Sequence, residues 1–306
     1  MSQPRREKRD VSGWVVLDKP LGMTSTTAVA AVRRIFKAKK AGHAGTLDPL
    51  ATGVLPIALG EATKTVPFVQ DGRKIYRFTV RFGIETDSDD AEGKETARSE
   101  TRPSREALEA LLPSFTGTIL QTPPQFSALK VDGERAYDLA RAGESVALAP
   151  REIEIDAFRL LSMPDADHAE FEVECGKGTY VRSLARDIGR TLGCLGHVSV
   201  LRRTLVGDFA EDDTVNLVEL EQASTDDATL FALMDPVAAG LRSLPAVKVS
   251  EHDAQRLTQG QSVFLRGRDA PIFEGPVSVC VHGALVALGE MEAGELHPRR
   301  IFNLAR

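Results

Sequence analysis

The loop "GHAGTLDPLATGVLP", residues 42–56, carries one carboxylate, Asp48, among small residues and prolines that suit neither a helix nor a strand. A metal site would need further carboxylates or histidines nearby, and a typical glycosidase needs a second carboxylate opposite the first. The loop supplies neither. The local sequence by itself favours an Asx turn, with Asp48 as its first residue before Pro49, and assigns the carboxylate no chemistry.

Cationic residues recur in the stretch "TYVRSLARDIGRTLG", residues 179–193. Arg182, Arg186 and Arg190 are spaced every four residues, beside an apolar stripe that includes Leu184 and Ile188. This spacing predicts a helix with one side in the core and a cationic side next to it. A phosphate contact or a solvated helix face is the better interpretation of Arg186 and Arg190.

Two further elements must position these side chains. The stretch "TSTTAVAAVRRIFKAKK", residues 24–40, begins with capping hydroxyls and ends in a cationic turn, which predicts a helix that leads into the glycine-rich loop. The stretch "KIYRFTVRF", residues 74–82, alternates, and Tyr76 lies on its apolar face. It is predicted to form a half-buried strand.

The composition is typical of a folded chain with mixed α and β structure (α/β or α+β). A length of 306 residues and 42% hydrophobic content suit one large domain and one small domain, each with a buried core. We predict a catalytic domain over residues 1–245. Residues 246–306 are expected to form a mostly β domain with one short helix capped by Ser250.

Charge is unevenly distributed along the chain. The net charge is −6, yet residues 1–81 contain 15 lysines and arginines against six aspartates and glutamates. This asymmetry fits a solvated surface and a nucleic-acid face equally well. Two acidic stretches, residues 85–95 and 211–227, are expected to be solvated.

Several classes of protein are disfavoured by the sequence. No apolar run approaches the roughly 20 residues of a membrane span, and "MSQPRREKRD" lacks the apolar segment of a secretory signal, so we expect a cytoplasmic protein. The three cysteines are far apart, and the six histidines show no metal-binding spacing. We therefore expect neither structural zinc nor disulfides.

Four separated motifs resemble the TruB-type tRNA pseudouridine synthases, in that family's order and approximate spacing. They are "DKPLGMTS" (18–25), "GHAGTLDPLATGVLP" (42–56), "PPQFSALKVDGERAYDLAR" (123–141) and "CGKGTYVRSLARDIG" (175–189), the last followed by "HVSVLRR" (197–203). Ala44 departs from the family, in which Thr is common there. The resemblance covers about residues 12–205, and the C-terminal 60 residues weakly resemble the RNA-binding PUA domain. It implies a mixed, largely antiparallel sheet flanked by helices.

The resemblance implies that Asp48 is the nucleophile that converts uridine 55 in the T loop of tRNA into pseudouridine. This reaction breaks the N1–C1′ bond, turns the base and joins C5 to C1′, so it needs no redox change and no cofactor. Attack of the carboxylate at C6 of the base and a route that begins at the sugar both remain open.

The resemblance also implies roles for three neighbours of Asp48. Arg182 matches the arginine that pairs with the catalytic acid and keeps it ionised. Tyr76 matches the tyrosine that stacks on the target base, where it is also suited to proton transfer from C5. Leu201 matches an apolar residue that packs near the acid and the base.

A base that is stacked in RNA must be extruded before a carboxylate can reach it. His43 resembles the histidine that stacks where the flipped nucleotide was. Residues 123–150 resemble an insert that closes on the T arm, with a short helix expected in "GERAYDLARAGE". Further candidate substrate contacts are Lys64, Lys130, Arg141 and Tyr180, and a solvated position is equally possible for the three charged residues.

The expected partner is therefore tRNA, bound by a monomer that needs no cofactor and no metal. Two alternatives remain open. A guide-RNA-dependent pseudouridine synthase shares the loop of Asp48, although the C-terminal region and the insert favour a stand-alone enzyme. A non-catalytic tRNA-folding chaperone would bind the same RNA without isomerising it.

Overall fold

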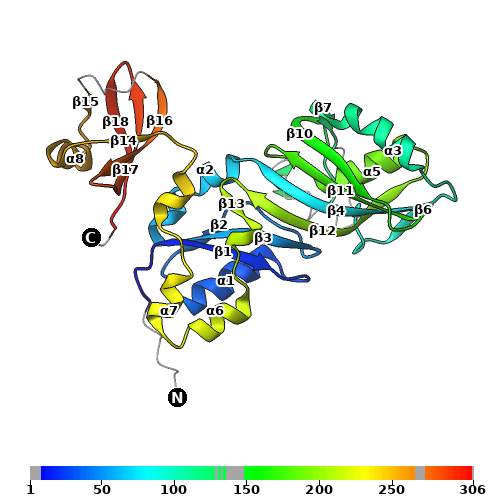
Figure 1. The fold of residues 1–306 in the computed structure, drawn as a ribbon, viewed down its shortest axis with the longest axis horizontal. Coiled ribbons are helices and arrows are strands. Elements are labelled where there is room, and N and C mark those ends of the chain that lie inside the picture. The colour runs from blue at the N-terminus through cyan, green and yellow to red at the C-terminus, as the bar shows by residue number, and fades with distance from the viewer. Residues whose placement is uncertain (1–7, 128–129, 132–133, 136–147, 266–272, 305–306) are drawn as a thin grey trace.

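A computed structural model describes residues 8–127, 130–131, 134–135, 148–265 and 273–304. Figure 1 shows a large body of mixed α and β structure and a smaller β-rich domain at the C-terminal end of the chain. Within the part of the chain that the structure describes, no helix is long and apolar enough to cross a membrane.

The large body is built on a mixed sheet of nine strands. Among its described strands, β3 and β12 pair in parallel and the other neighbours pair antiparallel. The strand order is β1 (Gly13–Lys19), β3 (Ala51–Leu59), β12 (Gly196–Val206), β4 (Lys74–Phe82), β11 (His168–Cys175), β10 (Arg151–Ser162) and β7 (Gly117–Gln121). Two short strands lie off this path: β2 (Ala41–His43) pairs with β3, and β13 (Phe209–Ala210) pairs with β12. The expected mixed, largely antiparallel sheet is confirmed.

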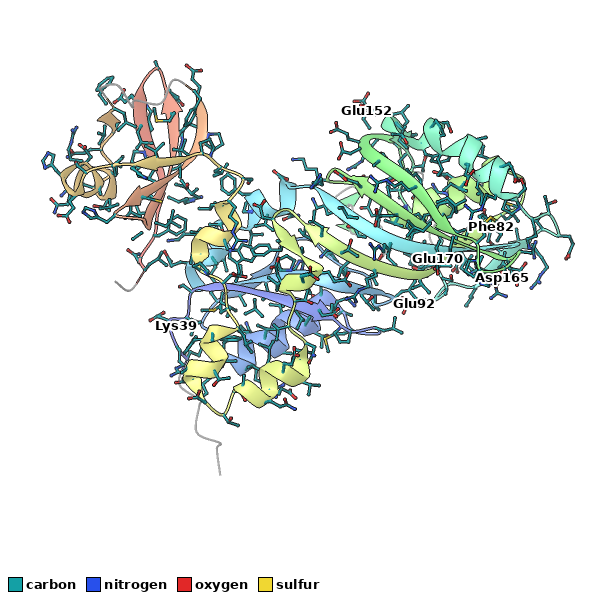
Figure 2. All side chains as sticks on the ribbon, in the orientation of Figure 1. Lys39, Phe82, Glu92, Glu152, Asp165 and Glu170 are labelled. Atoms are coloured by element: carbon teal, nitrogen blue, oxygen red, sulfur yellow. The ribbon has the colours of Figure 1, made fainter. Side chains whose placement is uncertain are left out.

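Helices and short hairpins flank this sheet. The helices are α1 (Ser25–Ile35), α2 (Val66–Asp71), α3 (Arg105–Leu111), α5 (Val181–Thr191), α6 (Leu217–Ala223) and α7 (Asp227–Ala232), with 3-10 turns at Gly60–Lys64, Leu112–Phe115, Glu211–Asp213 and Val237–Leu241. The hairpins pair β5 (Ile84–Thr86) with β6 (Glu95–Arg98) and β8 (Lys130–Val131) with β9 (Glu134–Arg135). In Figure 2, Asp165 and Phe82 mark the end of the sheet that is remote from the C-terminal domain.

The elements expected around the loop of Asp48 are present. α1 begins after Thr24, whose side chain accepts a hydrogen bond from the backbone N of Thr27. It ends at Ile35, short of the predicted residue 40, because Lys37 adopts a φ of 53°, which is incompatible with a right-handed helix. β4 spans the residues predicted for it, and α5 occupies most of the predicted helix.

Residues 211–227 are more ordered than the sequence indicated. Their acidic side chains are largely exposed, as expected, but the segment is not a simple solvated stretch. Leu220 of α6 and Leu230 of α7 are buried in the main core, and α6 packs against α1 (Figure 1). Apolar side chains at helical spacing between the acids anchor the segment.

The C-terminal domain contains a five-stranded sheet with its own small core. The strand order is β14 (Ala246–Lys248), β16 (Gly275–Val281), β17 (Ala284–Glu292), β18 (Glu295–Ile301) and β15 (Val263–Phe264). Helix α8 (Glu251–Thr258) begins after Ser250, whose hydroxyl accepts from the backbone N of Asp253, as predicted. Phe302 packs into an apolar cluster that also holds Trp14 of β1, so this domain contacts the large body directly.

Candidate active site

The acid loop, which we define as residues 44–50 between β2 and β3, is fixed to the start of α1. The Ser25 hydroxyl donates to the carbonyl of Leu47 (2.9 Å) and accepts from its N–H (2.8 Å). The ammonium group of Lys19 donates to the carbonyls of Met23 (2.7 Å) and Pro49 (3.4 Å). These bonds hold both neighbours of Asp48 in place, while the Asp48 side chain stays 39% exposed.

Arg182, in the first turn of α5, pairs with the acid. Its Nη2 lies 2.9 Å from Oδ2 of Asp48, and the arginine side chain is only 7% exposed. The guanidinium also donates to the carbonyls of Ser88 (3.0 Å) and Phe126 (2.9 Å), and its Nη1 lies 3.5 Å from Oδ2 of Asp90. A planar group held by several acceptors fixes the orientation of the carboxylate.

A cavity of about 270 Å³ opens beside Asp48 and Arg182. Its lining includes Tyr76, Tyr180 and Leu201. The sheet explains why distant positions meet here, because β12 lies between β3 and β4. Leu201 is paired with Ala51 of β3 on one side and with Phe78 of β4 on the other.

The two tyrosines of the cavity are held differently. Burial raises the pKa of Tyr76, and the charge of Arg203 acts against that rise. Tyr180 precedes α5, and its backbone N–H and carbonyl both bond the side-chain amide of the buried Gln121, at 2.8 and 3.0 Å. Burial also raises the pKa of Tyr180. Both phenols are therefore protonated near neutral pH.

Other predicted contacts lie outside the cavity. His43 is opposite Ile57 in the β2–β3 ladder, and its buried Nδ1 has no hydrogen-bond partner among the described residues. Burial lowers the pKa of His43, and the charge of Arg203 lowers it further. The imidazole is therefore neutral near pH 7.

The structure does not bring Lys64 into the site. Its ammonium group donates to Glu61 (2.6 Å) and to the carbonyl of Ile301 (2.8 Å), so it joins the large body to the C-terminal domain. Arg141 and the helix expected in "GERAYDLARAGE" lie outside the described residues, and only the backbone of Lys130 is described, in β8.

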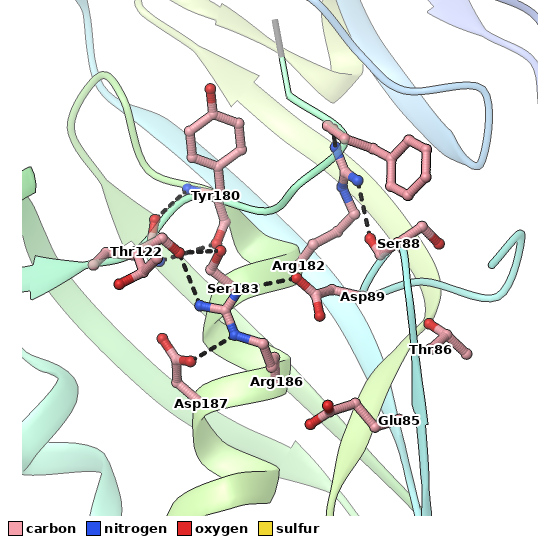
Figure 3. A network of polar contacts seen from close by, with 12 residues as sticks. Glu85, Thr86, Ser88, Asp89, Thr122, Tyr180, Arg182, Ser183, Arg186 and Asp187 are labelled. Carbon is pink, nitrogen blue, oxygen red and sulfur yellow. Dashed lines mark hydrogen bonds and ion pairs between the residues drawn. The ribbon is translucent and has the colours of Figure 1, made fainter. Parts of the chain in front are cut away.

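The acidic stretch 85–95 was wrongly interpreted as solvated. Asp89 and Asp90 are buried beside α5, and Arg186 is buried with them instead of lying on a solvated or phosphate-binding face. Arg186 contacts Asp89 (3.0 Å), Asp187 (2.8 Å) and the carbonyl of Thr122 (2.8 Å), as Figure 3 shows. In a sequence, a run of acidic residues beside a glycine is typical of a solvated loop. The arginine that pairs with Asp89 is 97 residues away, so no local pattern shows that this acid is buried.

The backbone conformation and the burial of Asp89 are both energetically unfavourable. Asp89 is a non-glycine residue with a φ of 61°, a conformation that strains an L-amino acid. Burial raises the pKa of Asp89 to about 6, although Arg186 and Arg182 favour its ionised form. Arg190, in contrast, is 55% exposed and pairs with Glu85.

Three buried cations on the sheet side of the site were also missed. Lys19, Lys74 and Arg203 are almost fully buried, and none has a carboxylate within 4.0 Å among the described residues. Burial lowers the pKa of Lys19 to about 8, and the charge of Asp48 opposes that change. One of them could have been found from the sequence. Successive residues of strand β12 point to opposite faces of the sheet, so one of Arg202 and Arg203 must face the core.

The described residues hold no group of three or more His, Cys, Asp or Glu side chains that could bind a metal ion. The site instead combines one accessible carboxylate, a buried arginine paired with it, an aromatic and apolar lining, and nearby positive charge. That arrangement suits covalent chemistry on a planar ring carried by a polyanion.

Comparison with known proteins identifies the family of the chain. Residues 33–181 match the TruB family pseudouridylate synthase N-terminal domain, residues 182–242 the tRNA pseudouridylate synthase B C-terminal domain, and residues 245–302 the C-terminal domain of pseudouridine synthase II TruB. The tRNA pseudouridine synthase B of Bradyrhizobium diazoefficiens is 61% identical over 99% of this chain and 89% of its own length. That of Brucella anthropi is 54% identical over 97% and 98%.

Solved structures give the same result. The chain is similar to one in an H/ACA RNP bound to a substrate RNA containing 2'-deoxyuridine, with a TM-score of 0.74 and 25% identity over 95% of this chain and 84% of that one. It is also similar to one in a Cbf5-Nop10-Gar1 complex, with a TM-score of 0.74 and 26% identity over 94% and 84%. With relatives of this identity along nearly its whole length, the chain belongs to the TruB family of pseudouridylate synthases, an isomerase family, and is an enzyme.

Proposed function

We propose that the enzyme converts uridine 55, in the T loop of tRNA, into pseudouridine, with Asp48 as the covalent nucleophile. The observation that carries this proposal is the 2.9 Å pair between Asp48 and the buried Arg182 at a cavity lined by Tyr76 and Leu201. The curated relatives that bear the name tRNA pseudouridine synthase B support tRNA as the substrate.

The residues of the site divide the reaction among them. Asp48 attacks C6 of the base or acts at the sugar, and Arg182 keeps its carboxylate oriented throughout. The N1–C1′ bond breaks, the base turns within the cavity, and C5 bonds to C1′. The apolar side chain of Leu201 offers no hydrogen bond that would trap the base in one orientation. The proton on C5 then leaves, with Tyr76 placed to receive it, and Asp48 is released unchanged.

The cavity can accept the base only after it leaves the stacked T loop. Base flipping costs a few kcal/mol, which is offset when other groups fill the space and bind the backbone. His43 lies on the strand that leads directly into the acid loop, and its neutral ring suits stacking in the vacated position. Lys74 and Lys177, at the cavity wall, supply positive charge near the phosphates. Since one chain builds the cavity, we infer that the enzyme acts as a monomer. A tRNA substrate is consistent with action in the cytoplasm.

The test uses the unmodified tRNA transcript with tritium at C5 of its uridines, and no other RNA or protein. We expect one equivalent of tritium release from the wild-type transcript and none from a matched transcript with cytidine at position 55. Release from the cytidine transcript would contradict the assignment of position 55. No release from either transcript would contradict tRNA as the substrate, or would show that the enzyme needs a guide RNA or another protein.

A guide-RNA-dependent activity is the second candidate, because the similar solved structures include an H/ACA RNP with bound substrate RNA. The same experiment separates the two, since a guide-dependent enzyme is inert on tRNA alone. A purely chaperone role would change the folding of the transcript without releasing tritium.

A further inference from the structure

Arg203 of β12 is buried behind the acid loop and bonds both the loop and strand β3, which follows it. The side chain is 1% exposed. Its Nε donates to the carbonyl of Val54 (2.9 Å), Nη2 to that of Gly45 (3.0 Å), and Nη1 more weakly to that of Thr46 (3.5 Å). Gly45 and Thr46 precede Asp48, and Val54 follows it, so a single guanidinium joins the two stems that present the nucleophile.

This cation is retained at a cost. A buried charge without a counter-ion loses several kcal/mol of hydration that hydrogen bonds to carbonyls only partly replace. Lys19 and Lys74 lie close enough that the charge of Arg203 lowers the pKa of both. A neutral side chain would avoid this repulsion, so the charge itself is useful at this position.

The charge faces Tyr76. Arg203 and Tyr76 are direct partners in the antiparallel β4–β12 ladder, so their side chains lie on the same face of the sheet, and both line the cavity. The charge of Arg203 and its hydrogen bond to the phenol lower the pKa of Tyr76, against the larger effect of burial. The charges of Cys175 in β11 and Asp48 in the acid loop both raise this pKa. Lys74, Lys177, Tyr180 and Arg182 line the same cavity.

We propose that Arg203 is a positioning residue that fixes the acid loop around Asp48 and polarises the Tyr76 hydroxyl for proton transfer from C5. The proposal rests on the proposed function, in which Tyr76 receives that proton. The phenol's own proton first passes to solvent, and Arg203 stabilises the negative charge left on the Tyr76 oxygen. The C5–H bond then breaks and its proton moves to that oxygen. Its electron pair forms the C5–C6 double bond as the C6–O bond to Asp48 breaks or, on the route that begins at the sugar, as the electron pair of the C6–N1 double bond returns to N1, which takes up a proton from solvent.

The first experiment measures Tyr76 in the free enzyme. The chain has three tyrosines, so labelling with 3-fluorotyrosine gives three fluorine resonances, and Tyr76→Phe identifies the relevant one. We expect Arg203→Met to move the titration of this resonance to higher pH by at least about one pH unit. The matched control is Arg202→Met, since Arg202 is the next residue but pairs with Asp18 and Glu211 outside the cavity. It should leave the titration unchanged.

The second experiment measures single-turnover tritium release at saturating enzyme. Arg203→Met and Arg203→Lys should each slow the reaction by about 10²-fold, with tRNA affinity within a few-fold of wild type. Lysine keeps the charge, so it should leave the Tyr76 titration near wild type, yet its compact ammonium group lacks the planar fork that spans the separated carbonyls of Gly45, Thr46 and Val54.

Two results would overturn the proposal: an unchanged Tyr76 titration in Arg203→Met, or a wild-type rate in Arg203→Lys. If Arg203→Met does not fold, Arg203→Lys decides through its rate. Because the titration needs no turnover, it can fail independently of the proposed function.

Discussion

The two sides of the cavity hold buried cations in opposite ways. On the α5 side, Arg182 and Arg186 each pair with buried carboxylates from the loop that follows β5. On the sheet side, Lys19, Lys74 and Arg203 donate to backbone carbonyls instead. The first arrangement balances charge and fixes geometry, whereas the second leaves a net positive region. Asp48 faces both sides, so its orientation and its electrostatic environment are set by different parts of the fold.

Among changes that compare the two sides, the largest expected effect comes from breaking the paired side with Arg182→Met. This change leaves Asp90 buried without its partner and Asp48 without an orienting group. We expect about 3 kcal/mol less unfolding free energy and a single-turnover rate about 10³-fold lower. Urea unfolding and tritium release measure these two quantities.

The matched control for this change is Arg190→Met, which removes the same charge from the same helix. Its pair with Glu85 has a 55% exposed arginine, and exposed pairs contribute at most about 1 kcal/mol. Equal losses in the two variants would show that the buried pairs have no special importance.

A smaller effect is expected from a change on the sheet side, where backbone carbonyls instead of carboxylates hold the buried cations. Gly53 of β3 has a φ of 94°, and an added Cβ would collide with the carbonyl oxygen of Arg203. Gly53→Ala should therefore destabilise the enzyme by about 2–3 kcal/mol and slow catalysis. Gly42→Ala is the control, because a Cβ there meets no atom within 4 Å. The melting temperatures of the two variants measure this effect. A Gly53→Ala variant that melts no lower than Gly42→Ala would contradict the account.

The smallest effect is a pH dependence on the paired side. Because burial raises the pKa of Asp89 from 3.8 to about 6, its protonated form is favoured in the folded enzyme. Its contribution to stability is therefore fully present below about pH 4 and is lost as the pH rises through about 6. Relative to Asp89→Asn, the wild type should lose on the order of 1–3 kcal/mol across this interval. Urea unfolding at several pH values measures the difference, and a relative gain with rising pH would show that Arg186 outweighs burial.

The difference between the two sides also explains what the sequence could predict. Periodicity located α1, β4 and α5, because each depends on residues within one turn or one strand of each other. The motifs indicated Asp48, Tyr76, Arg182 and Leu201 together, and the structure brings these four to one cavity. The roles assigned to them stay predictions.

The remaining features depend on contacts between distant segments. Asp89 meets Arg186 across 97 residues, and Arg203 meets Gly45 across 158, so no local pattern shows that these charges are buried. Lys64 was a candidate RNA contact because of its charge. Its position is instead determined by the docking of the C-terminal domain, where it donates to the carbonyl of Ile301.

The nucleophile is the central claim, and Asp48→Asn tests it most directly. Asparagine keeps the size and turn-forming capacity of aspartate, so the acid loop should survive, but its amide is a poor nucleophile and cannot form the ion pair with Arg182. Asp165→Asn, at the remote end of the sheet, is the matched control (Figure 2).

The measurement is single-turnover tritium release from C5 of an unmodified T-arm transcript, together with the affinity of each variant for that RNA. We predict that Asp48→Asn binds the RNA within a few-fold of wild type and releases no tritium, while Asp165→Asn reacts as the wild type does. Turnover by Asp48→Asn at a rate near wild type would show that Asp48 is only a turn residue and would contradict the account.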